Sequence, residues 1–308
     1  MAGTVRAKAL TRRRLGAAGA RALARCTSVS EAARMLATTP YGHDSPAEPS
    51  LAALQHAAGA TLLWHLRVVA GWLPRDGADA VRLLVAGFEV ANLDEHVARL
   101  RGLPAEPAYR LGTMETAWSR LRETASLDDV REVLGTSRWG DPGSSSPWAI
   151  GVAVRVAWAD RVAAGVAEAA QWARAATALL LVREVTLAGR RLDKTLTQRA
   201  TPVLGADFVA ALSPAAEIPA LVERLPSDTR WVLDGVAGPR DLWRAEASLC
   251  RRVEDDGFRL LHRSGFGRAA VVGVAAVLAV DAWRVRAALE SAARGGSGTA
   301  LEAFDAVA

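Results

Sequence analysis

The chain contains the same fifteen-residue pattern twice. Residues 28–42 read SVSEAARMLATTPYG, and residues 126–140 read SLDDVREVLGTSRWG. In both, a serine is followed by an acidic residue at +3, leucine at +8, threonine at +10, an aromatic residue at +13 and glycine at +14. The copies start 98 residues apart in a chain of 308 residues, which indicates that a structural unit is repeated within the chain.

Each copy predicts a short capped helix. Ser28 with Glu31, and Ser126 with Asp129, have the spacing of a capping box, in which the serine accepts a backbone N–H of the first turn and the carboxylate reaches back. The apolar residues that follow recur at helical spacing. The helix then ends at a turn whose aromatic residue either fixes the turn or anchors a partner.

A long amphipathic stretch with an acidic residue before valine follows each copy. Glu89 lies 48 residues after the aromatic Tyr41, and Glu184 lies 45 residues after the aromatic Trp139. Asn92 lies one helical turn beyond Glu89. The nearly constant spacing supports a duplicated unit of about one third of the chain, and the recurrence suggests that these polar residues face something shared.

A fainter third copy covers residues 217–231 and ends at Trp231. Two long helical stretches follow it, and in the last of them Trp283 and Arg286 occupy the positions where the other copies lead us to expect Glu and Asn. Three such units around an axis predict a pseudo-threefold body with a central cavity or a round partner. The predicted helical repeats are 1–105, 106–203 and 204–308.

The composition favours an all-α globular protein. Hydrophobic residues make up 51% of the chain and charged residues 23%, and long alternating β-branched runs are scarce. The formal net charge is +5, but positive and negative residues are interleaved along most of the sequence. The most apolar run, 269–280, has 12 residues, fewer than the roughly 20 needed to span a bilayer. We therefore expect a chain that is soluble or peripheral at a membrane.

Catalytic patterns are weak in this sequence. Gly265, Gly267 and Ala270 fit a loose dinucleotide loop, but a helix rather than a strand is expected before them. Asp128 and Asp129 resemble the aspartate-rich magnesium motif of all-helical isoprenoid enzymes, yet they fall in the first turn of a short helix, where the helix dipole favours acids in any case. We expect no catalytic residue, no metal and no cofactor. A basic all-helical module that binds nucleic acid or protein remains the alternative function.

Taken together, the motifs resemble the d/C subunit of the V-type and A-type rotary ATPases, the funnel-shaped part of the central stalk. The resemblance rests on residues 28–42, on the stretch 88–93 (FEVANL), on residues 126–140 and on the closing segment 265–295. It covers essentially the whole chain. Each motif alone is a weak match, and the resemblance depends on the order and spacing of the motifs.

The resemblance implies three homologous helical domains with pseudo-threefold symmetry, arranged as a funnel with a central cavity. Such a subunit has no catalysis of its own. It seats the rotor shaft, made of subunits D and F, and rests on the proteolipid ring. It would be cytoplasmic and peripheral on the cytoplasmic face of the membrane, with no nucleic acid as a partner.

Partner-binding residues carried over by motif come from the acidic stretches and from the turn ends. Leu187 stands in the second repeat where the family-like Asn falls, so the polar lining is expected to differ there. The candidate partner-binding residues are Glu89, Asn92, Glu184, Tyr41, Trp139 and Trp231.

Overall fold

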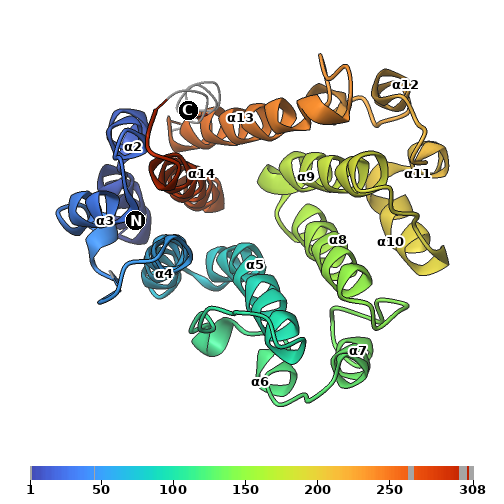
Figure 1. Ribbon diagram of the computed structural model, residues 1–308, viewed down its shortest axis with the longest axis horizontal. Helices are drawn as coiled ribbons and strands as arrows, with labels where there is room; N and C mark the ends of the chain where they lie inside the picture. Colours follow the sequence, from blue (N-terminus) through green and yellow to red (C-terminus); the bar gives the residue numbers. More distant parts are fainter. Residues whose placement is uncertain (1, 45, 263–266, 298–303, 305–308) are drawn as a thin grey trace. The chain divides into compact units, whose positions relative to one another are not determined.

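The computed structural model describes residues 2–44, 46–262, 267–297 and 304, and over these ranges the regular secondary structure is entirely helical. This confirms the all-α prediction (Figure 1). Gly265, from the loose dinucleotide pattern and the closing segment, lies outside the described residues. None of the helices in these ranges combines the length and apolar character needed to cross a bilayer.

The chain divides into two compact units, and the division falls inside two long helices. The terminal unit consists of residues 1–81 and 250–308, and the middle unit of residues 82–249. The three-repeat division stays a prediction. The dividing helices are α5 (Arg75–Leu100) and α13 (Leu242–His262).

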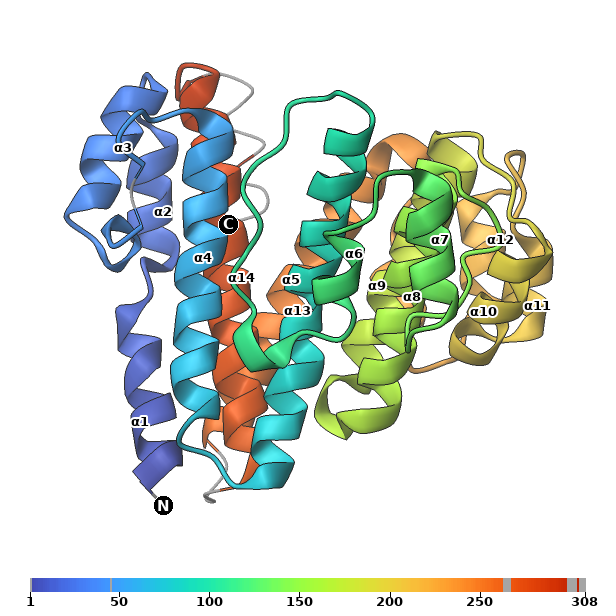
Figure 2. The same cartoon turned by 90° about the horizontal axis from the view of Figure 1, so that it is seen from below.

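The terminal unit joins the two ends of the chain. Its centre is α14, which packs against the first long helix and against the short N-terminal helices. Figure 2 shows the blue N-terminal helices beside this red helix. A buried cluster that includes Leu23, Leu36 and Leu289 holds them together. The helices of this unit are α1 (Ala2–Leu10), α2 (Gly16–Ala24), α3 (Val29–Ala37), α4 (Leu51–Ala70) and α14 (Arg268–Ala293), with η1 (Thr11–Arg13) and η2 (Pro40–Gly42) between them.

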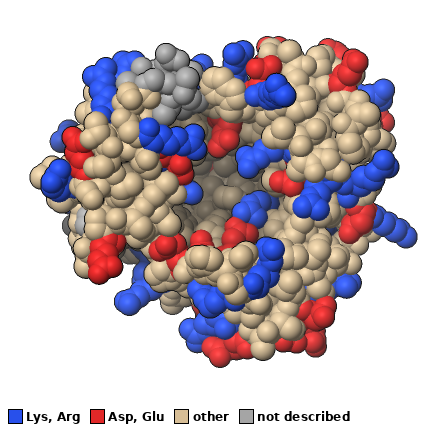
Figure 3. Space-filling model, in the orientation of Figure 1, with Lys and Arg blue, Asp and Glu red and all other residues tan. Residues whose placement is uncertain are grey.

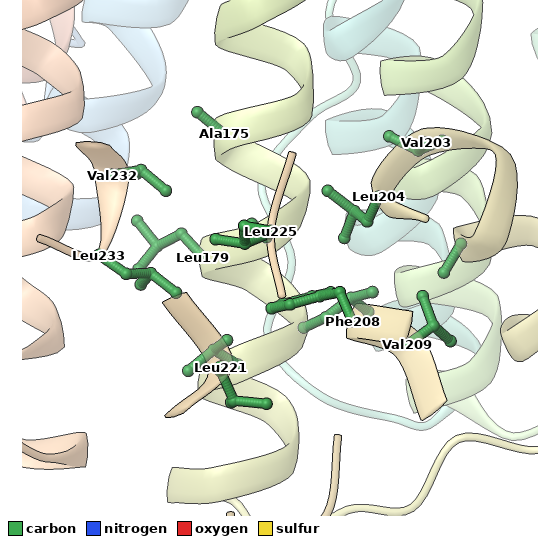
Figure 4. Packing of buried hydrophobic residues seen from close by; sticks show 14 of the residues in the cluster. Ala175, Leu179, Val203, Leu204, Phe208, Val209, Leu221, Leu225, Val232 and Leu233 are labelled. Atoms are coloured by element: carbon green, nitrogen blue, oxygen red, sulfur yellow. The ribbon is translucent and has the colours of Figure 1, made fainter. Parts of the chain in front are cut away.

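The middle unit is built around the pair α8 and α9, which pack closely. Its core includes a large apolar cluster in which Phe208, Leu221 and Leu225 are buried almost completely (Figure 4). The helices of this unit are α6 (Trp118–Leu121), α7 (Leu127–Gly135), α8 (Pro147–Gly165), α9 (Ala170–Val182), α10 (Lys194–Leu204), α11 (Ala206–Ala211) and α12 (Ile218–Val222). Short turns of helix join them: η3 (Gly112–Met114), η4 (Ala167–Ala169), the π-helix η5 (Arg183–Leu187), η6 (Arg230–Val232) and η7 (Pro239–Asp241).

Both predicted capping boxes are present. Ser28 accepts the backbone N–H of Glu31 at 3.2 Å, and Ser126 accepts that of Asp129 at 3.1 Å. Each carboxylate bonds the N–H of the residue just before the serine, at 2.8 Å from Thr27 and 3.2 Å from Ala125. The third short helix, α12, begins with proline in its first turn and has no side-chain cap. The third copy is therefore the least similar in detail.

In the terminal unit, α13 and α14 approach closely where glycines face each other. A Cβ added at Gly273 would lie 2.7 Å from the carbonyl oxygen of Gly257, a contact with backbone that cannot rotate away. Glycine costs helix stability in an interior position, so its presence here allows the two helices to come together.

We expect Gly273→Ala to lower the free energy of unfolding by about 1–3 kcal/mol, because overpacking outweighs the gain in helix propensity. The matched control is Gly77→Ala in α5, where the new Cβ would meet only the Leu73 side chain at 3.4 Å or more. That control should be neutral or stabilising by up to about 1 kcal/mol. Urea unfolding followed by circular dichroism measures both, and equal effects would contradict this account of the contact.

Candidate functional site

In the terminal unit, the carboxylate of Asp281 on α14 caps the start of α2. Its Oδ2 accepts the backbone N–H of Leu15 at 2.9 Å, and its Oδ1 accepts that of Gly16 at 2.8 Å. These are N–H groups for which a helix has no internal partner, and the positive end of the helix dipole favours an anion there. Gly16 has φ +71°, a backbone conformation that glycine adopts without strain.

The aromatic turn residue of the first repeated pattern completes this site. The hydroxyl of Tyr41 donates to Asp281 Oδ2 at 2.8 Å, and both side chains are buried. Burial, followed by the nearby negative charge of Asp281, raises the pKa of Tyr41 well above its usual value. Tyr41 is positioned by its own turn, because its backbone N–H donates to the hydroxyl of Thr39 at 3.2 Å. The phenol therefore stays a hydrogen-bond donor.

The middle unit contains the same arrangement, built from different residues. Glu89 on α5 accepts the backbone N–H groups of Thr116 and Ala117, at the start of α6, and Ala117 N lies 2.8 Å from Oε1. The indole Nε1 of Trp139 donates to the same oxygen at 2.8 Å. Trp139 N donates to the Ser137 hydroxyl at 3.1 Å, as Tyr41 N does to Thr39. We call each arrangement a carboxylate clamp.

Arginine accompanies each clamp. In the middle unit the Arg161 guanidinium lies 5.0 Å from the centre of the Trp139 ring. Burial, and then the charge of Arg138, lowers the pKa of Arg161, and the charge of Glu89 opposes this effect. In the terminal unit Arg284, almost fully buried, donates to both oxygens of Glu254 at 3.1 and 2.7 Å. The buried carboxylates thus lie beside buried or half-buried cations.

Asn92 fastens an extended segment onto α5. Its amide donates to the Tyr109 carbonyl at 2.9 Å and accepts the Tyr109 N–H at 2.6 Å. Further along α5, Glu95 accepts the Glu106 N–H at 2.7 Å. Residues 103–111 are thereby held along the helix and run back toward its start, in the segment that follows α5 in Figure 2.

Glu184 and Trp231 do not form a third clamp. Glu184 lies in the π-helix η5 and accepts the indole N–H of Trp148, on α8, at 2.7 Å. Trp231 donates to the Asp228 carbonyl within its own turn at 2.9 Å. The start of α10 is capped by Asp193, which accepts Leu196 N at 2.8 Å.

The structure brings two of the predicted acidic and aromatic residues together and gives Tyr41 a partner that was not predicted. Glu89 contacts Trp139, the aromatic residue after it, whereas Tyr41 contacts Asp281. The spacing of the sequence motifs places Trp283 at the acidic position, whereas the acidic residue that forms the clamp, Asp281, lies two positions earlier. Glu89, Asn92, Tyr41 and Trp139 are all buried, and their contact with a partner stays a prediction.

The two aspartates of the isoprenoid-like motif lie in the first turn of α7. Asp129 is the capping-box residue, and Asp128 accepts a hydrogen bond from Ser145. Across the described ranges, His, Cys, Asp and Glu side chains form no group of three that could hold a metal ion. In the clamps, each carboxylate already accepts three hydrogen bonds, so the geometry serves to hold helices together.

Comparison with known protein families and with curated proteins found no match to this chain.

The terminal clamp predicts a strong coupling between Asp281 and Tyr41. Asp281→Asn should lower the free energy of unfolding by about 2–4 kcal/mol, because an amide group then faces backbone donors and leaves them unsatisfied. Tyr41→Phe alone should cost about 1 kcal/mol. A double-mutant cycle in urea should give a coupling energy above about 0.5 kcal/mol, and simple additivity would contradict the clamp.

Two buried histidines predict that stability falls at mildly acidic pH. Burial, and then a nearby arginine, lowers the pKa of His65 and of His96 below the usual 6.5. The unfolded chain then binds more protons than the folded chain, so stability is present above pH 6.5 and is lost as pH falls through the lowered values.

Urea unfolding at a series of pH values from neutral to acidic measures this loss. His96 forms one hydrogen bond through its Nε2 atom, with the Thr124 hydroxyl at 2.8 Å. The side chain of Gln can form this hydrogen bond and does not titrate. The His96→Gln variant should therefore lose less stability on acidification than the parent chain. An equal loss would show that His96 does not contribute.

Proposed function

We propose that this chain is a central-stalk subunit of the d/C type in a rotary proton-translocating ATPase. In this role it seats the shaft formed by subunits D and F on the proteolipid ring and couples rotation to ion transport without catalysing a reaction. It lies on the cytoplasmic face of the membrane. Three helical repeats, 1–105, 106–203 and 204–308, form a funnel with a central cavity in this proposal.

The observation that supports the proposal is the carboxylate clamp, which occurs in both compact units. In each, a long helix, a short helix and the aromatic turn of a capped helix meet at one carboxylate. Two unrelated helical units would not be expected to share these contacts in the same order along the chain. A duplicated helical unit is what the resemblance to the socket subunits implies.

The face drawn in Figure 3 carries cations and anions side by side rather than one continuous basic patch. A chain that binds nucleic acid through its backbone charge needs a basic stripe. The mixed surface is what we expect of a protein that seats another protein through polar contacts.

The test is direct binding to a purified D–F shaft. Light scattering after size exclusion should give a one-to-one complex with Kd of about 1 µM or tighter. A two-stranded coiled coil of equal length and net charge serves as the control and should not bind. If no complex forms at micromolar concentrations, or if the control binds as well, the proposal is wrong.

A further inference from the structure

The surface at η5 carries two exposed apolar side chains that flank one ion pair. Arg183 lies 3.9 Å from Glu246, and this pair links η5 to the first turns of α13. Leu187 lies one turn after Arg183 in η5, and Trp243 lies one turn before Glu246 in α13. Each apolar side chain is therefore on the same face of its helix as the charged residue of the ion pair. Leu187 is 55% exposed and Trp243 is 41% exposed.

Four exposed cations lie on the elements that carry these two side chains or next to them, with Asp193 and Asp241 among them, and the Arg244 guanidinium lies 5.2 Å from the centre of the Trp243 ring. Arg190 and Arg191 follow Leu187 after two residues, and the Arg190 guanidinium lies 5.8 Å from the centre of the Trp148 ring. Lys194 begins the next helix, and η7, which carries Arg240, packs against η5. All four are exposed. Arg191, Lys194 and Arg240 make no ion pair with another part of the chain that the structure describes. We call Leu187, Trp243 and these four cations the 187–243 surface.

The corresponding position on α5 shows how such a surface is covered. Leu187 lies three residues after Glu184, as Asn92 lies three residues after Glu89. Asn92 is fully buried, because the extended segment 103–111 lies on it. Seventeen residues, 101–117, join α5 to α6 and supply this segment, whereas only six residues, 188–193, separate η5 from α10.

The chemistry of the two positions also differs in a consistent way. Where α5 offers Asn92 and Glu95 to the amide groups of its own segment, the 187–243 surface offers an apolar side chain and a set of cations. A segment that covers it must therefore supply apolar contact and negative charge. A π-helix is rare and often marks a functional position, which fits the placement of this surface on η5.

We propose that the 187–243 surface binds an extended acidic segment of a protein partner, which lies along η5 as residues 103–111 lie along α5. Leu187 and Trp243 contact the apolar residues of the segment, and Arg190, Arg191, Lys194 and Arg240 pair with its carboxylates. This inference does not depend on the central-stalk role and holds for the chain by itself.

The probe is a fluorescein-labelled nonapeptide, Leu-Pro-Ala-Glu-Pro-Ala-Glu-Glu-Leu, which is residues 103–111 with Glu in place of Tyr109 and Arg110. Fluorescence anisotropy with the full chain should give a Kd of about 10–100 µM. The affinity should decrease as salt rises, because exposed charges carry part of it.

Variants of the surface test the assignment. Arg190→Glu with Arg191→Glu should weaken binding about tenfold, and Leu187→Asp about fivefold. The matched control, Arg34→Glu with Arg224→Glu, reverses two exposed arginines elsewhere and should bind as the parent does. Circular dichroism checks that each variant keeps its fold.

Three results would overturn the inference. The peptide could show no binding at about 1 mM, which is weaker than any specific docking site of this kind. The surface variants could bind it as well as the control does. Alternatively, a labelled oligo-dT or phosphatidylserine vesicles could bind more tightly than the peptide and lose binding in the same variants, which would assign the surface to nucleic acid or to a membrane.

Discussion

The buried carboxylate at the start of a short helix is the interaction on which both compact units depend. A helix start leaves backbone N–H groups without internal partners, and a buried carboxylate needs donors. The clamps satisfy both requirements, because Asp281 and Glu89 accept the N–H groups at the starts of α2 and α6. The third donor comes from an aromatic turn residue. One side chain therefore fixes three elements at once.

The two clamps differ in how far apart their parts lie along the chain. Glu89 and Thr116 are 27 residues apart, whereas Asp281 and Gly16 are 265 residues apart. The loop-closure entropy of the terminal clamp is larger, and contacts of long sequence separation form slowly. The terminal unit is incomplete until α14 has been made and has returned to the N-terminal helices.

The sequence predicted the local features and did not predict the non-local contacts. Both capping boxes follow from spacing within one turn, and the structure contains both. The contacts between acidic and aromatic residues could not be predicted in the same way. The intervals from Tyr41 to Glu89 and from Trp139 to Glu184 each lie within one predicted repeat, whereas Glu89 contacts the aromatic residue of the next predicted repeat. The partner of Tyr41 lies near the other end of the chain, so no interval measured forward from Tyr41 identifies Asp281.

Glu89, Asp281 and Glu184 are each followed, three positions later, by a residue of a different kind. The type of that residue depends on the segment that covers it. Asn92 is covered by backbone and pairs with it, Arg284 is covered by α13 and pairs with Glu254, and Leu187 is left exposed. A covered side chain must form hydrogen bonds with the buried polar groups of the segment that covers it. Its polarity therefore depends on that neighbouring segment. The acidic residue itself must remain acidic where it accepts the N–H groups at the start of a helix. The two clamps can therefore share one arrangement while the residue three positions after the carboxylate differs, as Asn92 and Arg284 show.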